Sequence, residues 1–143
     1  MNLQTFLSEA LKNNGGSYNI TTGESNPTDG YMVSLPNCEE IFNADDLCAT
    51  VLKEYIIDNA DELSSENSFV GLWIDNGMVY LDVSVKYDDL ETACYFGIIN
   101  DQKAIYDNAN AVAIHLPTPQ RSGTMTQQRT YNYMAAQKAA RLI

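Results

Sequence analysis

The chain has a single histidine and only three cysteines among its 143 residues. The cysteines, Cys38, Cys48 and Cys94, form no Cys-x-x-Cys pair, and their odd number argues against a disulfide framework. With His115 as the lone imidazole, the sequence also lacks the ligand set of a zinc site. We therefore expect reduced thiols that pack as small apolar side chains, with no metal site and no cofactor. A nucleophilic cysteine paired with His115 is the alternative.

Long apolar runs and enzyme motifs are missing as well. No window approaches the roughly 18 apolar residues that a membrane span requires. The first eleven residues include Glu9 and lack the basic and apolar regions of a signal peptide. The sequence contains no phosphate-binding loop, dinucleotide fingerprint, metalloprotease helix or nucleophile elbow. These absences predict a non-enzymatic, cytoplasmic protein that does not associate with a membrane.

Acidic residues are absent from the end of the chain. All 19 of them lie at or before Asp107, whereas residues 120–143 carry four basic groups and no acid. Residues 1–119 therefore have a net charge of −15 and the tail +4, which gives −11 for the chain. The acidic body repels nucleic acid, and the tail offers at most four phosphate contacts. This distribution favours a basic protein surface as partner, with acidity that only maintains solubility as the alternative.

The hydrophobic pattern predicts an α+β fold with a mainly antiparallel sheet and helices largely on one face. Helices are expected at 3–13, at 44–59 and from a cap at Asp88 onward. Strands are expected at 17–22, 31–35, 69–75, 78–85, 104–107 and 111–116, with the first two paired across a loop. We expect one acidic domain over residues 1–116, a linker at 117–124 and a basic, amphipathic C-terminal helix at 125–143.

The strongest structural signal is the dipeptide Asn76-Gly77 between two alternating runs. Asn-Gly accepts the positive φ values that a type I′ hairpin turn requires. A two-residue turn fixes the register, so Gly71 is expected opposite Asp82. The aliphatic side chains then share one face, which is the predicted core: Val70, Leu72, Ile74, Val79, Leu81, Val83 and Val85.

The other face of this hairpin carries aromatic residues among carboxylates: Phe69, Trp73 and Tyr80 with Asp75 and Asp82. Aromatic side chains are frequent at binding hot spots, so this face is a candidate partner-binding surface. The two carboxylates are roughly 14 Å apart at ~3.4 Å per residue, wider than the separation of a glycosidase pair. The face is either covered by the C-terminal helix, bound to a partner or second copy, or part of a small-ligand pocket.

A second acidic segment follows the helix expected at 44–59. Its carboxylates are Asp58, Asp61, Glu62 and Glu66. They lack the ligand spacing of a calcium-binding hand, so the segment is either a solvated loop or charge retained for a partner. We include these four residues in the candidate partner-binding surface.

One part of the sequence resembles a family. The segment 71–84, GLWIDNGMVYLDVS, is followed after a helix by 100–107, NDQKAIYD. Together they resemble small accessory proteins of bacteriophages and other mobile elements, in which a Trp-x-Asp-x-Gly-x-Val-Tyr-Leu-Asp hairpin precedes an Asn-Gln-x-Ala-Ile-x-Asp strand. Here Asp101 interrupts the Asn-Gln pair, and the resemblance covers about 50 of the 143 residues. It implies a genomic context in which small acidic inhibitors of host defence nucleases occur, alongside virion and replication accessories.

Charge, hairpin and resemblance together predict a non-enzymatic accessory protein that acts in the cytoplasm of a bacterial host. Its expected partner is a basic protein surface on a nucleic-acid-binding defence complex of the CRISPR or restriction type. The acidic surface would occupy that partner as a nucleic-acid mimic and inhibit it. The alternative is a virion assembly protein that oligomerises through the C-terminal helix, using Tyr131, Met134 and Leu142.

Overall fold

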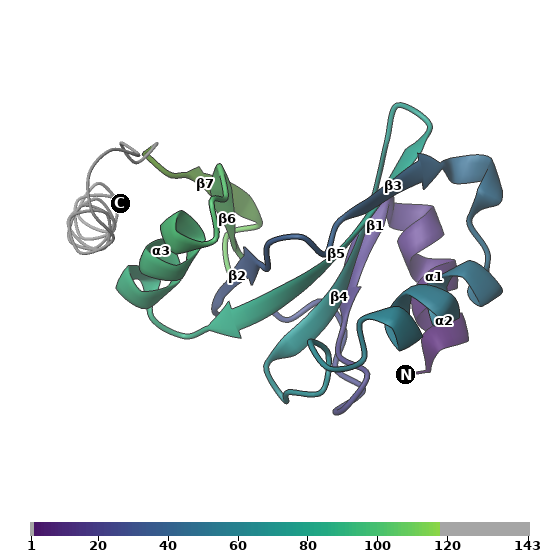
Figure 1. Ribbon diagram of the computed structural model, residues 1–143, viewed down its shortest axis with the longest axis horizontal. Coiled ribbons are helices and arrows are strands. Elements are labelled where there is room, and N and C mark those ends of the chain that lie inside the picture. The colour runs from purple at the N-terminus through teal and green to yellow at the C-terminus, as the bar shows by residue number, and fades with distance from the viewer. Residues whose placement is uncertain (1, 118–143) are drawn as a thin grey trace. The chain divides into compact units, whose positions relative to one another are not determined.

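The computed structural model describes residues 2–117 of the chain. Those residues form three α-helices and seven β-strands, and every strand pair with an assigned register is antiparallel (Figure 1). The predicted α+β class is therefore confirmed. The helix predicted at 125–143 lies outside the described residues, as does the predicted linker at 117–124 apart from Pro117.

The described residues divide into two compact units. The first unit comprises residues 2–27 and 37–85, and the second comprises residues 28–36 and 86–117. The chain passes between them three times.

The first unit is a four-stranded antiparallel arrangement with two helices. Its elements are α1 (Leu3–Asn13), β1 (Gly15–Tyr18), β3 (Glu40–Asn43), α2 (Ala49–Asp58), β4 (Ser68–Asp75) and β5 (Met78–Tyr87). The last two residues of β5, Lys86 and Tyr87, belong to the second unit. The strands lie in the order β1, β4, β5, β3. α1 and α2 lie on the same side of these strands (Figure 1).

The β4–β5 hairpin has the predicted turn and register. Asn76 and Gly77 have φ values of 50° and 76°, as a type I′ turn requires. Asp75 pairs with Met78, and Gly71 pairs with Asp82. Five of the predicted core residues have an exposed fraction of 0%: Val70, Leu72, Val79, Leu81 and Val83. The aliphatic face of the hairpin is therefore the core of this unit.

The helix α1 has the predicted boundaries and is capped at both ends. The Asn2 side chain accepts a hydrogen bond from the Thr5 backbone N–H at 2.9 Å, which satisfies one of the unpaired donors at the helix start. Asn14 ends the helix with a left-handed φ of 59°. Phe6 is buried and stacks on Tyr18 of β1 with ring centroids 5.2 Å apart. This stacking anchors α1 on the aliphatic face.

Two local predictions in the first unit are wrong. β1 pairs with β4 and not with β2, because the chain turns at Asn19, whose side chain accepts from the backbone N–H groups of Thr21 and Thr22. The helix expected at 44–59 begins only at Ala49. Asn43 caps a short 3₁₀ helix over Ala44–Asp46 instead.

The second unit packs one helix on a three-stranded antiparallel arrangement. Its elements are β2 (Tyr31–Ser34), α3 (Leu90–Ile99), β6 (Ala104–Asp107) and β7 (Val112–His115), in strand order β2, β6, β7. Its buried core consists of Val33, Ala93, Cys94, Ile98 and Ile105. Asp89 caps α3 by accepting from the Thr92 backbone N–H at 2.8 Å, one residue later than the predicted cap.

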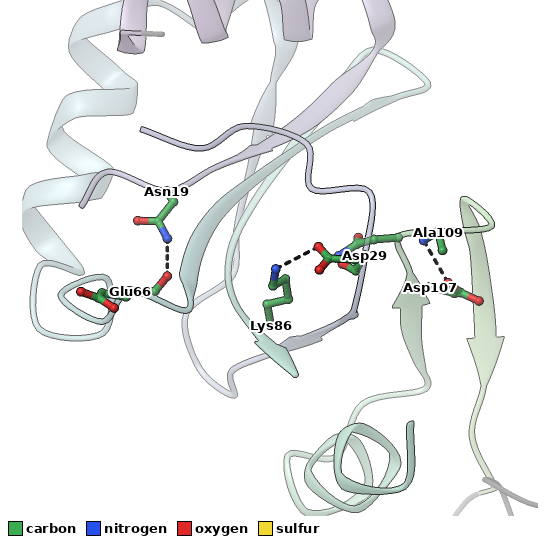
Figure 2. A network of polar contacts seen from close by, with 7 residues as sticks. Asn19, Asp29, Glu66, Lys86, Asp107 and Ala109 are labelled. Carbon is green, nitrogen blue, oxygen red and sulfur yellow. Dashed lines mark hydrogen bonds and ion pairs between the residues drawn. The ribbon is translucent and has the colours of Figure 1, made fainter. Parts of the chain in front are cut away.

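Polar contacts fix the loops of the second unit (Figure 2). Lys86 Nζ lies 3.1 Å from the Asp29 carboxylate, and Asn108 Nδ2 donates to the Asp29 backbone carbonyl at 2.9 Å. In the β6–β7 turn, the Asp107 carboxylate accepts from the side chain and backbone of Asn110 and from the Ala109 N–H. These donors hold the pKa of Asp107 below its usual value of 3.8, because they stabilise the ionised form.

Candidate protein-binding face

The outer face of the first unit, opposite the helices, carries a row of residues across four neighbouring strands. Gly15 of β1 pairs with Trp73 of β4, Trp73 pairs with Tyr80 of β5, and Tyr80 pairs with Ile41 of β3. Trp73 and Ile41 are each 52% exposed, and Tyr80 is half-buried. We call Trp73, Tyr80 and Ile41 the outer row. It places three large side chains on one exposed face of the sheet.

Two glycines shape this face, because each leaves room for the side chain of the residue opposite it. A Cβ on Gly15 would lie 2.6 Å from Trp73 Cε3, so the indole ring extends across Gly15. A Cβ on Gly71 would collide with Asp82 Oδ1, so the carboxylate extends across Gly71. The Ser84 hydroxyl donates to the same carboxylate at 3.4 Å. Any larger residue at Gly15 or Gly71 would displace a predicted binding residue.

Carboxylates lie on both sides of the outer row. Asp75 is exposed and lies two residues beyond Trp73 on β4, while Asp82 is half-buried and lies two residues beyond Tyr80 on β5. The confirmed register puts them four positions apart on opposite strands, roughly 14 Å at ~3.4 Å per residue. They are therefore too far apart to share a proton or to act on one bond.

Phe69 belongs to the predicted face but is buried. Its exposed fraction is 0%, although the alternation places it on the same side of the hairpin as Trp73. Ser84, its cross-strand partner, is also buried. The hairpin's outer face is thus accessible only toward its turn, and Phe69 is not part of the exposed surface.

Ile41 was not predicted, because the strand that carries it was not predicted. Only two apolar residues, Ile41 and Phe42, lie between the acids before them and Asn43, which is too short a run for a clear alternating pattern. β3 becomes a strand through its pairing with Met78–Leu81 of β5. The sequence signal for this strand is the pair Ile41-Phe42, because β-branched and aromatic residues favour β-strands.

Several carboxylates gather around the segment leading into β3. The Tyr55 hydroxyl donates to the Cys38 carbonyl at 2.6 Å. Burial raises the pKa of Tyr55, and the nearby charges of Asp82, Glu40 and Glu39 raise it further, with a contribution from Cys38. Burial followed by the charges of Glu62 and Asp82 raises the pKa of the Cys38 thiol. The segment leading into β3 therefore lies close to several negative charges.

The negative charge of the protein is concentrated on the first unit. Residues 2–27 and 37–85 hold thirteen acidic and two basic side chains, a net charge of −11, whereas residues 28–36 and 86–117 have a net charge of −4. The four acids of the predicted acidic segment are all exposed: Asp58, Asp61, Glu62 and Glu66.

This acidic segment is anchored at two points. Leu63 in its middle is fully buried. The Glu66 backbone carbonyl accepts from the Asn19 side chain at 2.6 Å (Figure 2). The segment thus presents carboxylates on a fixed backbone in the same unit as the outer row.

Metal-binding side chains are dispersed in the part of the chain that the structure describes. Within 2–117, no group of three or more His, Cys, Asp or Glu side chains is arranged to hold a metal ion. A shallow groove of about 300 Å³ lies beside α1 and α2 and is lined by Leu3, Tyr18, Ile20, Lys53, Ile56 and Ile57. This lining is apolar apart from the Lys53 ammonium group and the Tyr18 hydroxyl.

The three thiols should differ sharply in reactivity. Cys48 is exposed, whereas Cys94 is fully buried. Burial, with the charges of Asp89 and Glu91, raises the pKa of Cys94 to about 11, which disfavours the thiolate that nucleophilic chemistry needs.

With Ellman's reagent at pH 8, we expect Cys48 to react rapidly and Cys94 only after unfolding. The Cys48→Ser variant should lose the rapid phase and Cys94→Ser should keep it; a rapid phase that survives Cys48→Ser would contradict this.

Comparison with known proteins adds no identification. The chain matches no protein-family model, and neither curated proteins nor solved structures gave a match. Among the described residues, no helix combines the length and apolar character needed to cross a lipid bilayer. The predicted oligomerisation residues, Tyr131, Met134 and Leu142, lie outside the described part of the chain.

Proposed function

We propose that this protein is a non-enzymatic binding protein that covers a basic surface of another protein. The observation that carries the proposal is the outer row, two of whose side chains are 52% exposed within a unit of net charge −11. Exposed aromatic and aliphatic side chains supply contact area at protein interfaces. Surrounding carboxylates steer an oppositely charged partner toward that contact and repel nucleic acid.

The target that fits this chemistry is a nucleic-acid-binding host defence complex of the CRISPR or restriction type. Such a complex presents a basic channel, because duplex DNA carries one negative charge per ~1.7 Å of its axis. The carboxylates of the first unit, including Asp58, Asp61, Glu62 and Glu66, would take the place of phosphates there. The resemblance of residues 71–84 to accessory proteins of mobile elements supports this target and a place of action in the host cytoplasm.

The proposal is tested by competition with DNA. We expect purified defence nucleases to include one that loses DNA binding when the full-length protein is added. Inhibition should weaken by about tenfold or more as salt rises from 50 to 200 mM, because ionic contacts dominate the association. Replacing the four acids of the 58–66 segment by their amides should slow association while leaving the fold intact by circular dichroism. Inhibition that is indifferent to both salt and these substitutions would contradict the proposed mechanism.

The alternative, assembly of a virion through Tyr131, Met134 and Leu142, makes a different prediction for a chain that lacks residues 120–143. Loss of oligomers with inhibition intact would support the binding function. An obligate assembly without any inhibition of a nuclease would support the structural alternative. The oligomeric state is measured by light scattering at matched protein concentration.

A further inference from the structure

We propose that β7 pairs with β7 of a second copy of this chain, in an antiparallel arrangement centred on Ile114. β7 is the last strand of the second unit and hydrogen-bonds to β6 on one side. Among residues 2–117, no strand pairs with its other side (Figure 1). An open edge of this kind is a template for another strand. The inference goes beyond the proposed function and does not depend on it.

The hydrogen-bonding pattern shows which backbone groups face the open edge. The Leu116 N–H donates to the Lys103 carbonyl at 2.8 Å. In an antiparallel pair, residues that bond to the neighbouring strand alternate with residues whose N–H and C=O point the other way. Leu116 and Ile114 therefore bond to β6. Ala113 and His115 direct their N–H and C=O groups to the open edge, and both residues are exposed.

This edge carries none of the charges that usually guard against strand pairing. All 19 acids lie at or before Asp107, and residues 108–117 contain no lysine or arginine either. Two copies with a net charge of −11 each repel one another, so a segment without acids is the favourable place for contact. The charge distribution therefore favours self-association through this strand.

The ends of β7 select the register of the pair. Ala111 has a left-handed φ of 54°, which turns the chain out of the strand, and Pro117 has no N–H. Centring the pair on Ile114 places Ala113 of each copy opposite His115 of the other. Each of these two pairs can exchange two hydrogen bonds, which gives four. Centring it on Ala113 or His115 would instead oppose one of them with Ala111 or Pro117, which cannot complete such a pair.

The same register matches the side chains. Ile114 and Leu116 pack against the buried core of the second unit, and Val112 shares their face of the strand. α3 lies on β2 and β6, and Val112 beyond them is 49% exposed. In the pair, Ile114 lies opposite its own counterpart and Val112 opposite Leu116, with Cα atoms about 4.5 Å apart. Aliphatic surface that is open in one copy would thus be covered by the other.

The association is tested with the full-length protein by sedimentation over a range of concentrations. The interface is small, so we expect a reversible dimer. Ala113→Pro removes an outward N–H and leaves the bonds to β6 in place, so it should raise the dissociation constant about tenfold or more. Ala113→Ser keeps the N–H and is the matched control. Higher salt should strengthen the dimer, because it screens the repulsion between two acidic chains.

The register is tested by disulfide cross-linking in a background with Cys38→Ser and Cys48→Ser, which leaves only the buried Cys94. Ile114→Cys lies at the centre of the pair, with Cα atoms about 4.5 Å apart, and should cross-link under mild oxidation. Ala113→Cys is the matched control. Its counterpart is a diagonal neighbour roughly 7–8 Å away, so it should give about tenfold less linked dimer.

A protein that stays monomeric at every concentration and salt would overturn the proposal, as would a dimer that Ala113→Pro leaves intact. If Ala113→Pro is unfolded by circular dichroism, the two cysteine variants decide the outcome. Cross-linking of Ala113→Cys in place of Ile114→Cys, or of neither variant, would overturn the pairing of β7. Inhibition of a nuclease is measured separately, so failure of this inference leaves the proposed function standing.

Discussion

Replacing Leu81 by alanine is expected to lower the free energy of unfolding by about 3 kcal/mol. Leu81 and its cross-strand partner Leu72 are both fully buried on the face that α1 and α2 cover. Truncation removes three carbon atoms from a site bounded by strands and helices, so the surroundings cannot collapse fully and a cavity remains. The change is measured by urea denaturation of the wild type and the variant.

The matched control for Leu81→Ala is Ile41→Ala. Both residues lie in the first unit's sheet, but Ile41 is on the outer face and is 52% exposed. Its truncation is expected to cost less than about 1 kcal/mol, because little apolar surface leaves the core. Similar losses in the two variants would contradict the assignment of one covered and one open face.

Replacing Asn19 by alanine is expected to lower the free energy of unfolding by about 2–3 kcal/mol. The Asn19 side chain is fully buried and makes three hydrogen bonds. Its Nδ2 donates to the Glu66 carbonyl at 2.6 Å (Figure 2), and its Oδ1 accepts from Thr21 and Thr22 at 2.9 and 3.1 Å. Alanine would leave these backbone groups without the side chain that satisfies them, at a cost of about 1 kcal/mol each.

The control for Asn19 is Asn26→Gly, because Asn26 has a left-handed φ of 47° that alanine would adopt only with strain. Asn26 is an exposed asparagine in the same loop whose side chain accepts one hydrogen bond, from the Ser17 N–H at 2.9 Å. Water can replace that bond, so its loss should cost about 0.5–1 kcal/mol. Chemical denaturation compares the two variants. A loss at Asn19 no greater than the loss at Asn26 would show that Asn19 does not hold the start of β4 to the end of β1.

Local signals in the sequence were sufficient for α1 and for the β4–β5 hairpin. Asn2 and Asn14 act at the two ends of α1 through hydrogen bonds and backbone angles that depend on near neighbours. The dipeptide Asn76-Gly77 fixed a two-residue turn, and the register of all eight pairs follows from it. In both cases the deciding interactions join residues close in sequence.

Pairing between distant segments was not predictable in the same way. β1 has few side chains to pack and joins β4 more than fifty residues later, and nothing in its own pattern selects that partner. β3 has too short an apolar run to be recognised alone, so Ile41 was missed. Phe69 was placed on the same face as Trp73, but its burial was not predicted, because alternation reports the side of a strand and not what covers it.

The sequence by itself determined the α+β class, the hairpin register, and the excess of acid from which we propose a basic partner. Turn chemistry, residue alternation and net charge are properties of the chain that folding does not change. Only the tertiary structure decided which aromatic residues are exposed, that thirteen of the acids belong to one unit, and that the Trp73 and Asp82 side chains extend over Gly15 and Gly71. Those features depend on which strands become neighbours, and that depends on long-range packing that no local pattern records.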